Sequence, residues 1–311
     1  SALLAWGTYE LVEKKVRNAS SWQNLRAPAA GMVLIMAMVT SGTLGVLVMT
    51  YQVSSRSATN PLMAEVGIAA VDGKYGPDEM IPGDTNTAVV FIGDSHMKHY
   101  LPVIRRLVRE RAKPVKSVIF KTAGGCAPIP GIERKGKRCN EFVKEALDSA
   151  QRPEVDTVVF SASWRGFVQR DDYFRVEDGP ESDSGKLKFS ESEIKWLMRE
   201  FERTLETMLA DGKKVFVMLS SPRGRELHPK ALVDHTWLGV RSSLSGAETT
   251  RGVAHTVDPI DIEVMQTAAR VGAKIIDPTD RLCIDGFCPA VDSDGRPIYR
   301  DMSHVRATIS R

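Results

Sequence analysis

The pattern of hydrophobic and polar positions divides the 311-residue chain into three regions. Residues 29–51 form an apolar run without a charged residue, and a helix of that length, roughly 34 Å, would cross a bilayer core. Residues 52–86 show little periodicity and predict a connector. From residue 87 onward, short apolar runs alternate with longer amphipathic segments, which is typical of strands alternating with helices.

Apolar runs in the last region predict the buried strands of a parallel sheet. The longest predicted helix begins with a capping box, in which Ser190 is followed by Glu193. Strands and helices that alternate at this spacing predict an α/β fold, with a parallel sheet of about five strands covered on both faces. The predicted strands are residues 87–92, 115–121, 155–161, 214–219 and 274–277, and the predicted helices are residues 97–111, 140–150, 190–210 and 258–271.

Charged residues beside the apolar run predict its orientation in a membrane. Four basic residues precede the run, and only Arg56 lies close behind it. The positive-inside rule therefore places residues 1–28 in the cytoplasm and everything after Tyr51 on the exported side. The run is too long and too far along the sequence for a signal peptide, and a buried soluble helix seldom has so long a charge-free stretch. A transmembrane helix is expected over residues 29–51.

Net charge and cysteine placement limit the partners and the compartment. Lys and Arg number 42 against 39 Asp and Glu, and the chain without residues 1–55 has 38 basic and 37 acidic residues. No nucleic-acid partner is expected from such a balance. All four cysteines lie on the predicted exported side, where disulfides are stable. Their separations favour the pairs Cys126–Cys139 and Cys283–Cys288, although three connectivities are possible; zinc-type CxxC spacing is absent, so no metal site is predicted.

Candidate catalytic residues follow the predicted strands, at the edge where parallel sheets bind ligands. Ser95 follows the first strand within Gly93-Asp94-Ser95-His96, and Asp301 and His304 lie three residues apart near the C-terminus. At this spacing Asp301 can orient His304, which can take the proton of the Ser95 hydroxyl. Each motif alone is weak, because a Gly-Asp-Ser tripeptide is often only a loop. The GxSxG elbow, GxGxxG and the P-loop are absent from the sequence.

Together these segments resemble the SGNH (GDSL-type) family of esterases and acyltransferases. The sequences FIGDSH around Ser95, the glycines after the second strand and the C-terminal DMSH carry the resemblance, which covers residues 87–311. The resemblance implies a three-layer α/β/α fold, with Ser95 as the nucleophile and with Asp301 and His304 completing a catalytic triad.

Donors for an oxyanion are expected after the second and third strands. The backbone N–H groups of Ser95 and of Gly125, which we favour over Gly124, are the first candidates. The asparagine that the family carries after the third strand is absent, and this segment reads SASWRG. Arg165 could replace that donor, and Trp164 could either support a sugar ring or pack in the core. The candidate substrate-binding residues are Trp164, Arg165 and His96.

The segment TYELVEKKVRN (residues 8–18) is similar to the one that closes the membrane domain of acyltransferase family 3 (AT3). Tyr9 and Glu13 match, whereas Lys14-Lys15 departs from the pattern, and a basic helix on the membrane surface is the alternative. AT3 proteins fused to SGNH domains have an extra membrane helix and a linker. The implied organisation is the end of a membrane domain (1–28), a transmembrane helix (29–51), a periplasmic linker (52–86) and an SGNH domain (87–311), together the C-terminal portion of a larger protein.

The resemblance implies an O-acyltransferase, most directly an O-acetyltransferase, in the bacterial inner membrane with its SGNH domain in the periplasm. Its own membrane domain would supply an acyl group derived from acetyl-CoA, and this portion would bind no cofactor. Ser95 would carry the acyl group to a sugar hydroxyl of a surface polysaccharide such as lipopolysaccharide O-antigen, deprotonated by His304. An exported carbohydrate O-acetyl esterase and a non-catalytic glycan-binding module are the alternatives.

Overall fold

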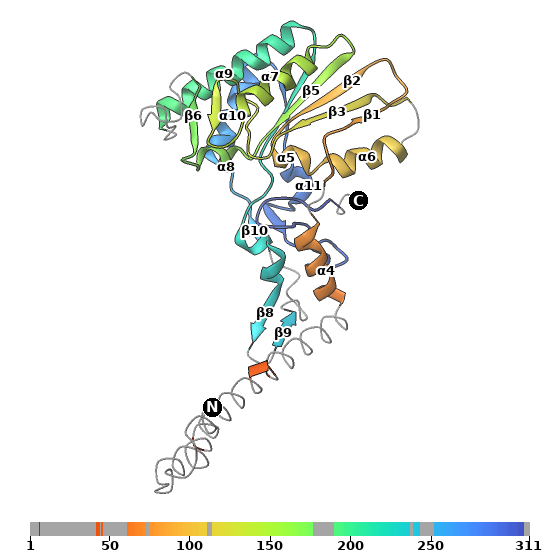
Figure 1. Ribbon diagram of the computed structural model, residues 1–311, viewed down its shortest axis with the longest axis vertical. Helices are drawn as coiled ribbons and strands as arrows, with labels where there is room; N and C mark the ends of the chain where they lie inside the picture. Colours follow the sequence, from red (N-terminus) through yellow and green to blue (C-terminus); the bar gives the residue numbers. More distant parts are fainter. Residues whose placement is uncertain are drawn as a thin grey trace, which may run out of the picture. The chain divides into compact units, whose positions relative to one another are not determined.

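The chain forms two compact units, residues 1–60 and 61–311, and the second holds the strands and helices described below (Figure 1). The predicted transmembrane helix over residues 29–51 lies outside the described residues, apart from three isolated positions. Among the helices that are described, none is both long and apolar enough to cross a membrane. The computed structural model describes residues 6, 42, 43, 45, 61–72, 75–110, 114–176, 190–236, 239–242 and 252–307.

A six-stranded sheet in the order β1-β3-β2-β5-β7-β11 forms the centre of the second unit. The last five strands of this order are parallel, while the two-residue β1 pairs with β3 in the antiparallel sense. The predicted α/β architecture is confirmed, but the sheet is mixed, because it includes this short antiparallel edge strand, which was not predicted from the sequence. The strands are β1 (Met80–Ile81), β2 (Ala88–Gly93), β3 (Ser117–Thr122), β5 (Val155–Ser161), β7 (Lys214–Met218) and β11 (Lys274–Ile276).

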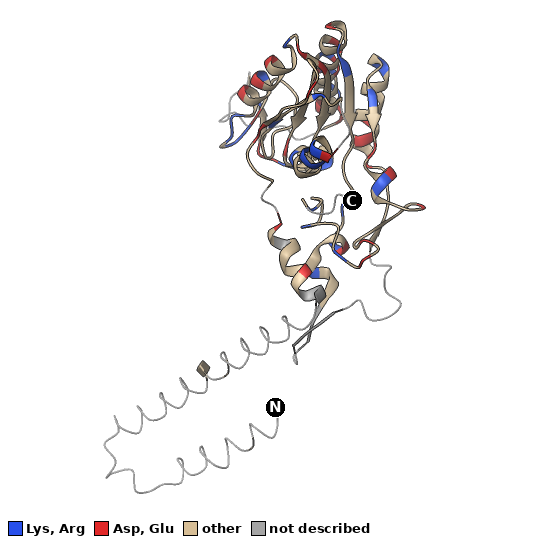
Figure 2. Cartoon of the chain, turned by 90° about the vertical axis from the view of Figure 1, so that its right-hand side faces the viewer, with Lys and Arg blue, Asp and Glu red and all other residues tan. Residues whose placement is uncertain are grey.

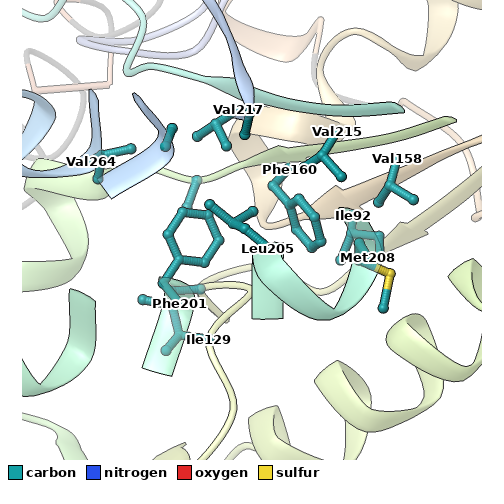
Figure 3. Close-up of a cluster of buried hydrophobic side chains, with 14 of the residues drawn as sticks. Ile92, Ile129, Val158, Phe160, Phe201, Leu205, Met208, Val215, Val217 and Val264 are labelled. Carbon is teal, nitrogen blue, oxygen red and sulfur yellow. The ribbon is translucent and has the colours of Figure 1, made fainter. Parts of the chain in front are cut away.

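Helices cover both faces of the sheet, because side chains alternate between the faces along each strand. From β2, Val90 and Ile92 enter a core that also contains Phe160 and Phe201 (Figure 3), whereas Phe91 packs on the opposite core. Helices α7, α9 and α10 contribute to the first core, and α5 and α6 to the second. Their bounds are α5 (Ser95–Lys98), α6 (Leu101–Glu110), α7 (Cys139–Ala150), α9 (Glu191–Ala210) and α10 (Pro259–Val271).

Helices α9 and α10 begin directly after capping residues that are visible in the sequence. Ser190 and Glu193 form the predicted capping box of α9, and Asp258 caps α10. The single helix predicted over residues 97–111 is instead two helices, α5 and α6. Pro102 is the second residue of α6, where its missing N–H costs no hydrogen bond.

Smaller elements extend the loops around the sheet. Both predicted disulfides, Cys126–Cys139 and Cys283–Cys288, are present. Basic and acidic residues are interspersed along the ribbon of this unit (Figure 2), in keeping with its balanced charge. The two-stranded sheets pair β4 (Ile132–Arg134) with β6 (Tyr173–Arg175), β8 (Val233–Thr236) with β9 (Gly239–Ser242), and β10 (Gly252–Ala254) with β12 (Phe287–Pro289). The short helices are α8 (Trp164–Val168), α11 (Thr279–Leu282), η3 (Arg225–Leu227) and η4 (Pro229–Leu232).

Part of the predicted connector packs inside the second unit. Helix α4 (Pro61–Val71) contributes Val66 to a small core that it shares with the C-terminal segment. Beside this core, Arg306, whose side chain is 4% exposed, pairs with Glu65 at 3.1 Å and with Asp72 at 3.2 Å. These ion pairs attach the last described residues of the chain to the first helix of the unit.

Replacing Arg306 with alanine should lower the free energy of unfolding by about 3 kcal/mol, because the substitution removes a buried cation from two carboxylates. Urea denaturation followed by tryptophan fluorescence measures this loss. Arg203→Ala is the control, because Arg203 forms an exposed pair with Glu200 on α9 and such pairs contribute about 0–1 kcal/mol. Equal losses in the two variants would contradict the structural role of Arg306.

Candidate active site

The strand order brings the candidate residues to one edge of the sheet. β2 lies between β3 and β5, so the chain leaves β2 at the point where open α/β sheets bind ligands. Ser95 begins helix α5 directly after β2, Gly125 lies in the loop after β3, and Ser163 lies in the loop after β5.

Ser95, His304 and Asp301 lie in a continuous hydrogen-bonded row. His304 Nε2 is 2.8 Å from Ser95 Oγ, and His304 Nδ1 is 2.9 Å from Asp301 Oδ2. Because the carboxylate accepts the proton of Nδ1, the unprotonated Nε2 faces the serine hydroxyl. The structure thus brings together three residues that the sequence places at opposite ends of the domain, in a geometry that allows Ser95 to transfer its proton to His304.

Backbone groups fix the carboxylate of Asp301. Its Oδ1 accepts hydrogen bonds from the N–H groups of Ser303 and His304, each at 2.9 Å. Burial raises the pKa of Asp301, but the hydrogen bonds from the His304 side chain and from these backbone groups outweigh burial and hold the pKa well below its ordinary value. Asp301 therefore stays ionised and keeps the imidazole in one orientation.

Asp94 connects the loop of Ser95 with the loop after β5. Its Oδ1 accepts from the N–H of His96 at 2.8 Å and caps α5, and its Oδ2 accepts from the N–H of Ser163 at 3.1 Å. Burial raises the pKa of Asp94 to about 6 against the effect of these hydrogen bonds. One buried carboxylate thus positions two loops that are 69 residues apart in sequence.

Of the two glycines considered for an oxyanion hole, only Gly125 lines the cavity that contains Ser95. The φ angle of Gly125 is +74°, and a Cβ at this position would lie 2.0 Å from Arg134 Nη1. A larger residue would therefore be strained and would collide with that side chain. This placement favours Gly125 over Gly124, and its role as a donor stays a prediction.

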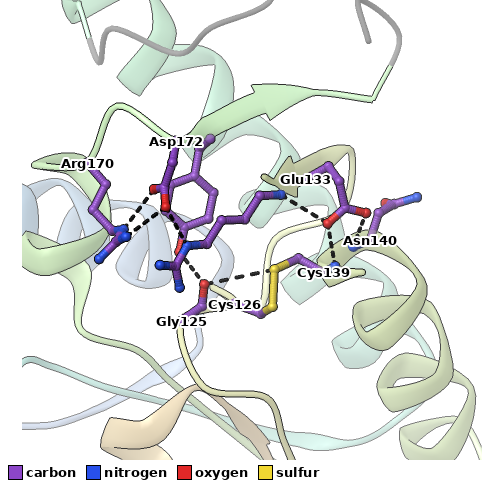
Figure 4. The surroundings of a disulfide bond; sticks show 9 residues. Gly125, Cys126, Glu133, Cys139, Asn140, Arg170 and Asp172 are labelled. Carbon is purple, nitrogen blue, oxygen red and sulfur yellow. Dashed lines mark hydrogen bonds and ion pairs between the residues drawn. A yellow bond between two sulfur atoms is a disulfide. The ribbon is translucent and has the colours of Figure 1, made fainter. Parts of the chain in front are cut away.

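Several contacts hold the loop of Gly125 in place (Figure 4). The Tyr173 hydroxyl donates a hydrogen bond to the Gly125 carbonyl, and the next residue, Cys126, is bonded to Cys139 at the start of α7. Asp172, beside Tyr173, pairs with Arg134 at 2.9 Å and with Arg170 at 2.7 Å. The segment after β5 therefore supports the loop after β3.

Two cavities meet beside the triad. The first contains Ser95 and His304, and the second extends towards Arg165 and His255. Arg223 lines both cavities, and it follows β7, so the rule of carboxyl strand ends could have identified it. Arg170 and Tyr173, which line the first cavity, come from a polar segment whose orientation the sequence does not reveal.

Of the two roles considered for Trp164, the structure shows the core position, and it places Arg165 beside the second cavity. Trp164 is 0% exposed, its Nε1 donates to the Met218 carbonyl at 3.0 Å, and its ring packs on Phe201. It therefore packs in the core and offers no face to a sugar ring. Arg165 pairs with Asp258 at 3.1 Å and lines the second cavity instead of the one with Ser95, which does not fit an oxyanion donor.

His96 lies behind the triad. It is 5% exposed and lines both cavities, and its ring centre is 4.4 Å from that of His304. His96 Nε2 lies 3.5 Å from Ser303 Oγ. His99 is 1% exposed and lies next to His96.

Among the described residues, one group has the side chains of a metal site. His255, Cys283 and Cys288 have ligand atoms within 4.8 Å of one another. The two cysteines form a disulfide, so they present no thiolate to an ion. The donor set therefore does not fit a metal centre.

The fold and this arrangement define a protein of the SGNH class. The family model described as the SGNH domain fused to AT3 domains matches residues 68–311, and the chain belongs to this family. No curated protein matches the sequence.

A search of solved structures finds similar chains at low sequence identity. One is the periplasmic domain of a lipopolysaccharide acetyltransferase from Salmonella ser. Paratyphi A, with 11% identity over 78% of this chain and 83% of that chain and a TM-score of 0.47. Another is the acetyl xylan esterase AlAXEase, with 12% identity over 72% of this chain and 94% of that chain and a TM-score of 0.35.

Burial of His96 makes folding sensitive to acid. Burial lowers the pKa of His96 from 6.5 to about 3, so the folded state binds fewer protons there than the unfolded chain. The uncharged, buried His96 therefore contributes fully to the stability of the folded state above pH 6.5, and this contribution is lost as the pH falls from 6.5 towards 3. The Tm of the wild type should therefore fall more steeply over this window than the Tm of His96→Gln, as measured by calorimetry.

The matched control for this measurement is His255→Gln, because His255 is only half-buried. Its Tm should follow the pH dependence of the wild type. A His96→Gln variant whose Tm changes with pH as steeply as that of the wild type would contradict the assignment.

Proposed function

We propose that this chain is the acyl-transferring portion of an O-acyltransferase, specifically an O-acetyltransferase, in which Ser95 carries the acyl group. The row of hydrogen bonds from Ser95 through His304 to Asp301 is the observation that carries the proposal. Membership of a family fused to AT3 domains supports a membrane domain as the source of the acyl group.

The reaction proceeds in two halves. Ser95 Oγ attacks the acyl carbonyl carbon and gives its proton to His304 Nε2, the leaving group departs with that proton, and an ester remains on Ser95. In the second half, His304 takes the proton of an acceptor hydroxyl, whose oxygen attacks the ester and releases Ser95. Asp301 stabilises the imidazolium that forms in each half.

The acceptor in this proposal is a sugar hydroxyl of a surface polysaccharide such as lipopolysaccharide O-antigen. The cavity beside the triad is lined by polar groups from the loops after several strands, among them Ser163 and Arg223, which also line the adjoining second cavity. Hydroxyl and guanidinium groups suit a sugar, whose hydroxyls both donate and accept hydrogen bonds.

The proposed location is the bacterial inner membrane, with the described domain in the periplasm. Two disulfides support an oxidising compartment. The apolar run at residues 29–51 would anchor the domain, and residues 1–28 would end the membrane domain. Residues 52–86 would lead from the anchor to the SGNH domain at residues 87–311, with helix α4 of this segment packed in the same compact unit as that domain. Acetyl-CoA would be the ultimate donor on the cytoplasmic side.

A carbohydrate O-acetyl esterase is the second candidate, because water can replace the acceptor hydroxyl in the same triad. The side chain of His304 is 22% exposed, so water reaches the site. Rapid hydrolysis of an activated acetyl ester by this chain alone favours the esterase, whereas acetylation of an oligosaccharide only with the membrane domain favours the transferase. A non-catalytic glycan-binding module would do neither.

Ser95→Ala should abolish O-acetylation of the surface polysaccharide and leave the fold intact, because it removes only the attacking oxygen. Acetyl content measured by NMR of the purified polysaccharide, from a strain carrying the variant at the native locus, tests this. The control is Ser192→Ala, an exposed serine at the start of α9, which should keep the wild-type content. Full acetylation in the Ser95→Ala strain would refute the proposal.

A further inference from the structure

The oxyanion hole of this chain needs a donor that the family resemblance does not provide. The family places an asparagine after the third parallel strand, and here that segment reads SASWRG. Trp164 is buried in the core, and Arg165 pairs with Asp258 in the neighbouring cavity. We propose that the hydroxyl of Ser163 is the third donor to the oxyanion that forms when Ser95 attacks the acyl group, an inference that rests on the proposed function.

Ser163 is positioned relative to the nucleophile. Its N–H donates to Asp94 Oδ2 at 3.1 Å, and the other oxygen of that carboxylate caps the helix that begins with Ser95. Ser163 lines the same cavity as Ser95, Gly125 and His304. The three donor segments therefore converge on one space from the ends of β2, β3 and β5.

The hydroxyl of Ser163 is available to a ligand. Within the part of the chain that the structure describes, its Oγ makes no hydrogen bond, and the residue is partly exposed to the cavity. Gly166, one turn later in α8, leaves room for it, because a Cβ there would lie 2.4 Å from Ser163 Oγ. Because Gly166 has no side chain, the Ser163 hydroxyl can occupy its observed position.

Arg223 supplies positive charge beside this hydroxyl. A Cβ built on Gly166 would lie 2.4 Å from Ser163 Oγ and 3.2 Å from Arg223 Nη1, so the two side chains approach the same face of this glycine. Arg223 also lines the same cavity as Ser163. A guanidinium only donates hydrogen bonds, so Arg223 leaves the proton of Ser163 free to point at the oxyanion. The cation also favours negative charge at this place.

The proton and electron pairs balance in the proposed step. Ser95 Oγ bonds to the acyl carbon, its proton moves to His304 Nε2, and the π pair of the carbonyl moves onto oxygen. That oxygen accepts hydrogen bonds from the N–H groups of Ser95 and Gly125 and from the O–H of Ser163. When the carbonyl re-forms, the bond to the leaving group breaks, and the leaving group takes the proton from His304.

Ser163→Ala tests the inference in the hydrolysis of 4-nitrophenyl acetate by the full chain. The turnover number should fall by about 10²–10³-fold with little change in KM, because an oxyanion donor acts in the transition state. The Tm should not change, since the N–H that binds Asp94 remains. Phenylboronic acid forms an adduct with Ser95 that places an oxygen in the oxyanion hole, so Ser163→Ala should also bind this inhibitor more weakly. Ser163→Thr keeps a hydroxyl and should retain most of the wild-type activity.

Controls separate this inference from the proposed function. Ser149→Ala removes a buried hydroxyl from α7 and should leave turnover unchanged. Wild-type turnover in Ser163→Ala, together with an inactive Ser95→Ala, would overturn the inference and leave the proposed function standing. Activity in Ser95→Ala would overturn the proposed function itself. If Ser163→Ala fails to fold, Ser163→Cys decides, because a thiol is a weak donor: reduced turnover supports the inference, and wild-type turnover refutes it.

Discussion

Two backbone N–H groups, those of His96 and Ser163, donate to the buried carboxylate of Asp94, and the candidate site depends on this arrangement. The first hydrogen bond begins α5 and so directs the Ser95 hydroxyl, and the second brings the end of β5 to the same place. The carboxylate is costly to bury, which is why the pKa of Asp94 is raised to about 6. Two loops from neighbouring strands thereby share one support.

The other half of the site comes from the end of the chain. His304 and Asp301 lie on a loop without regular structure, so their position depends on what surrounds it. Gly224 donates to the carbonyl of Met302, and Arg306 is paired with carboxylates of α4 and of the residue that follows it. The segment that looked like a connector in the sequence therefore helps to hold the base against the nucleophile.

Strong local signals made much of the fold predictable. The strand predicted over residues 155–161 has the observed bounds of β5, and the capping box at Ser190 begins α9 as expected. The two-residue β1 and the strands of the two-stranded sheets escaped prediction, because such short strands have no periodicity. Their pairing depends on tertiary contacts that no local pattern encodes.

The candidate site was predictable only where a motif marked it. Ser95, Asp301 and His304 stood out because their types and spacing suggest one chemistry, and their geometry agrees. The surroundings of Ser95 could not be read in the same way. Nothing local distinguishes Ser163, whose position depends on a hydrogen bond to a residue 69 positions away. The role of Trp164 was ambiguous in the sequence, because an indole ring can pack in a core or stack on a sugar.

Mass spectrometry of the trapped acyl-enzyme shows whether Ser95 carries the acyl group. The full chain is mixed with 4-nitrophenyl acetate, quenched in acid within milliseconds to seconds, and digested for peptide mapping. We expect one added acetyl group on the peptide that contains Ser95, and none in Ser95→Ala. A wild-type protein that turns over the ester without this adduct, or an adduct that persists in Ser95→Ala, would contradict this role of Ser95.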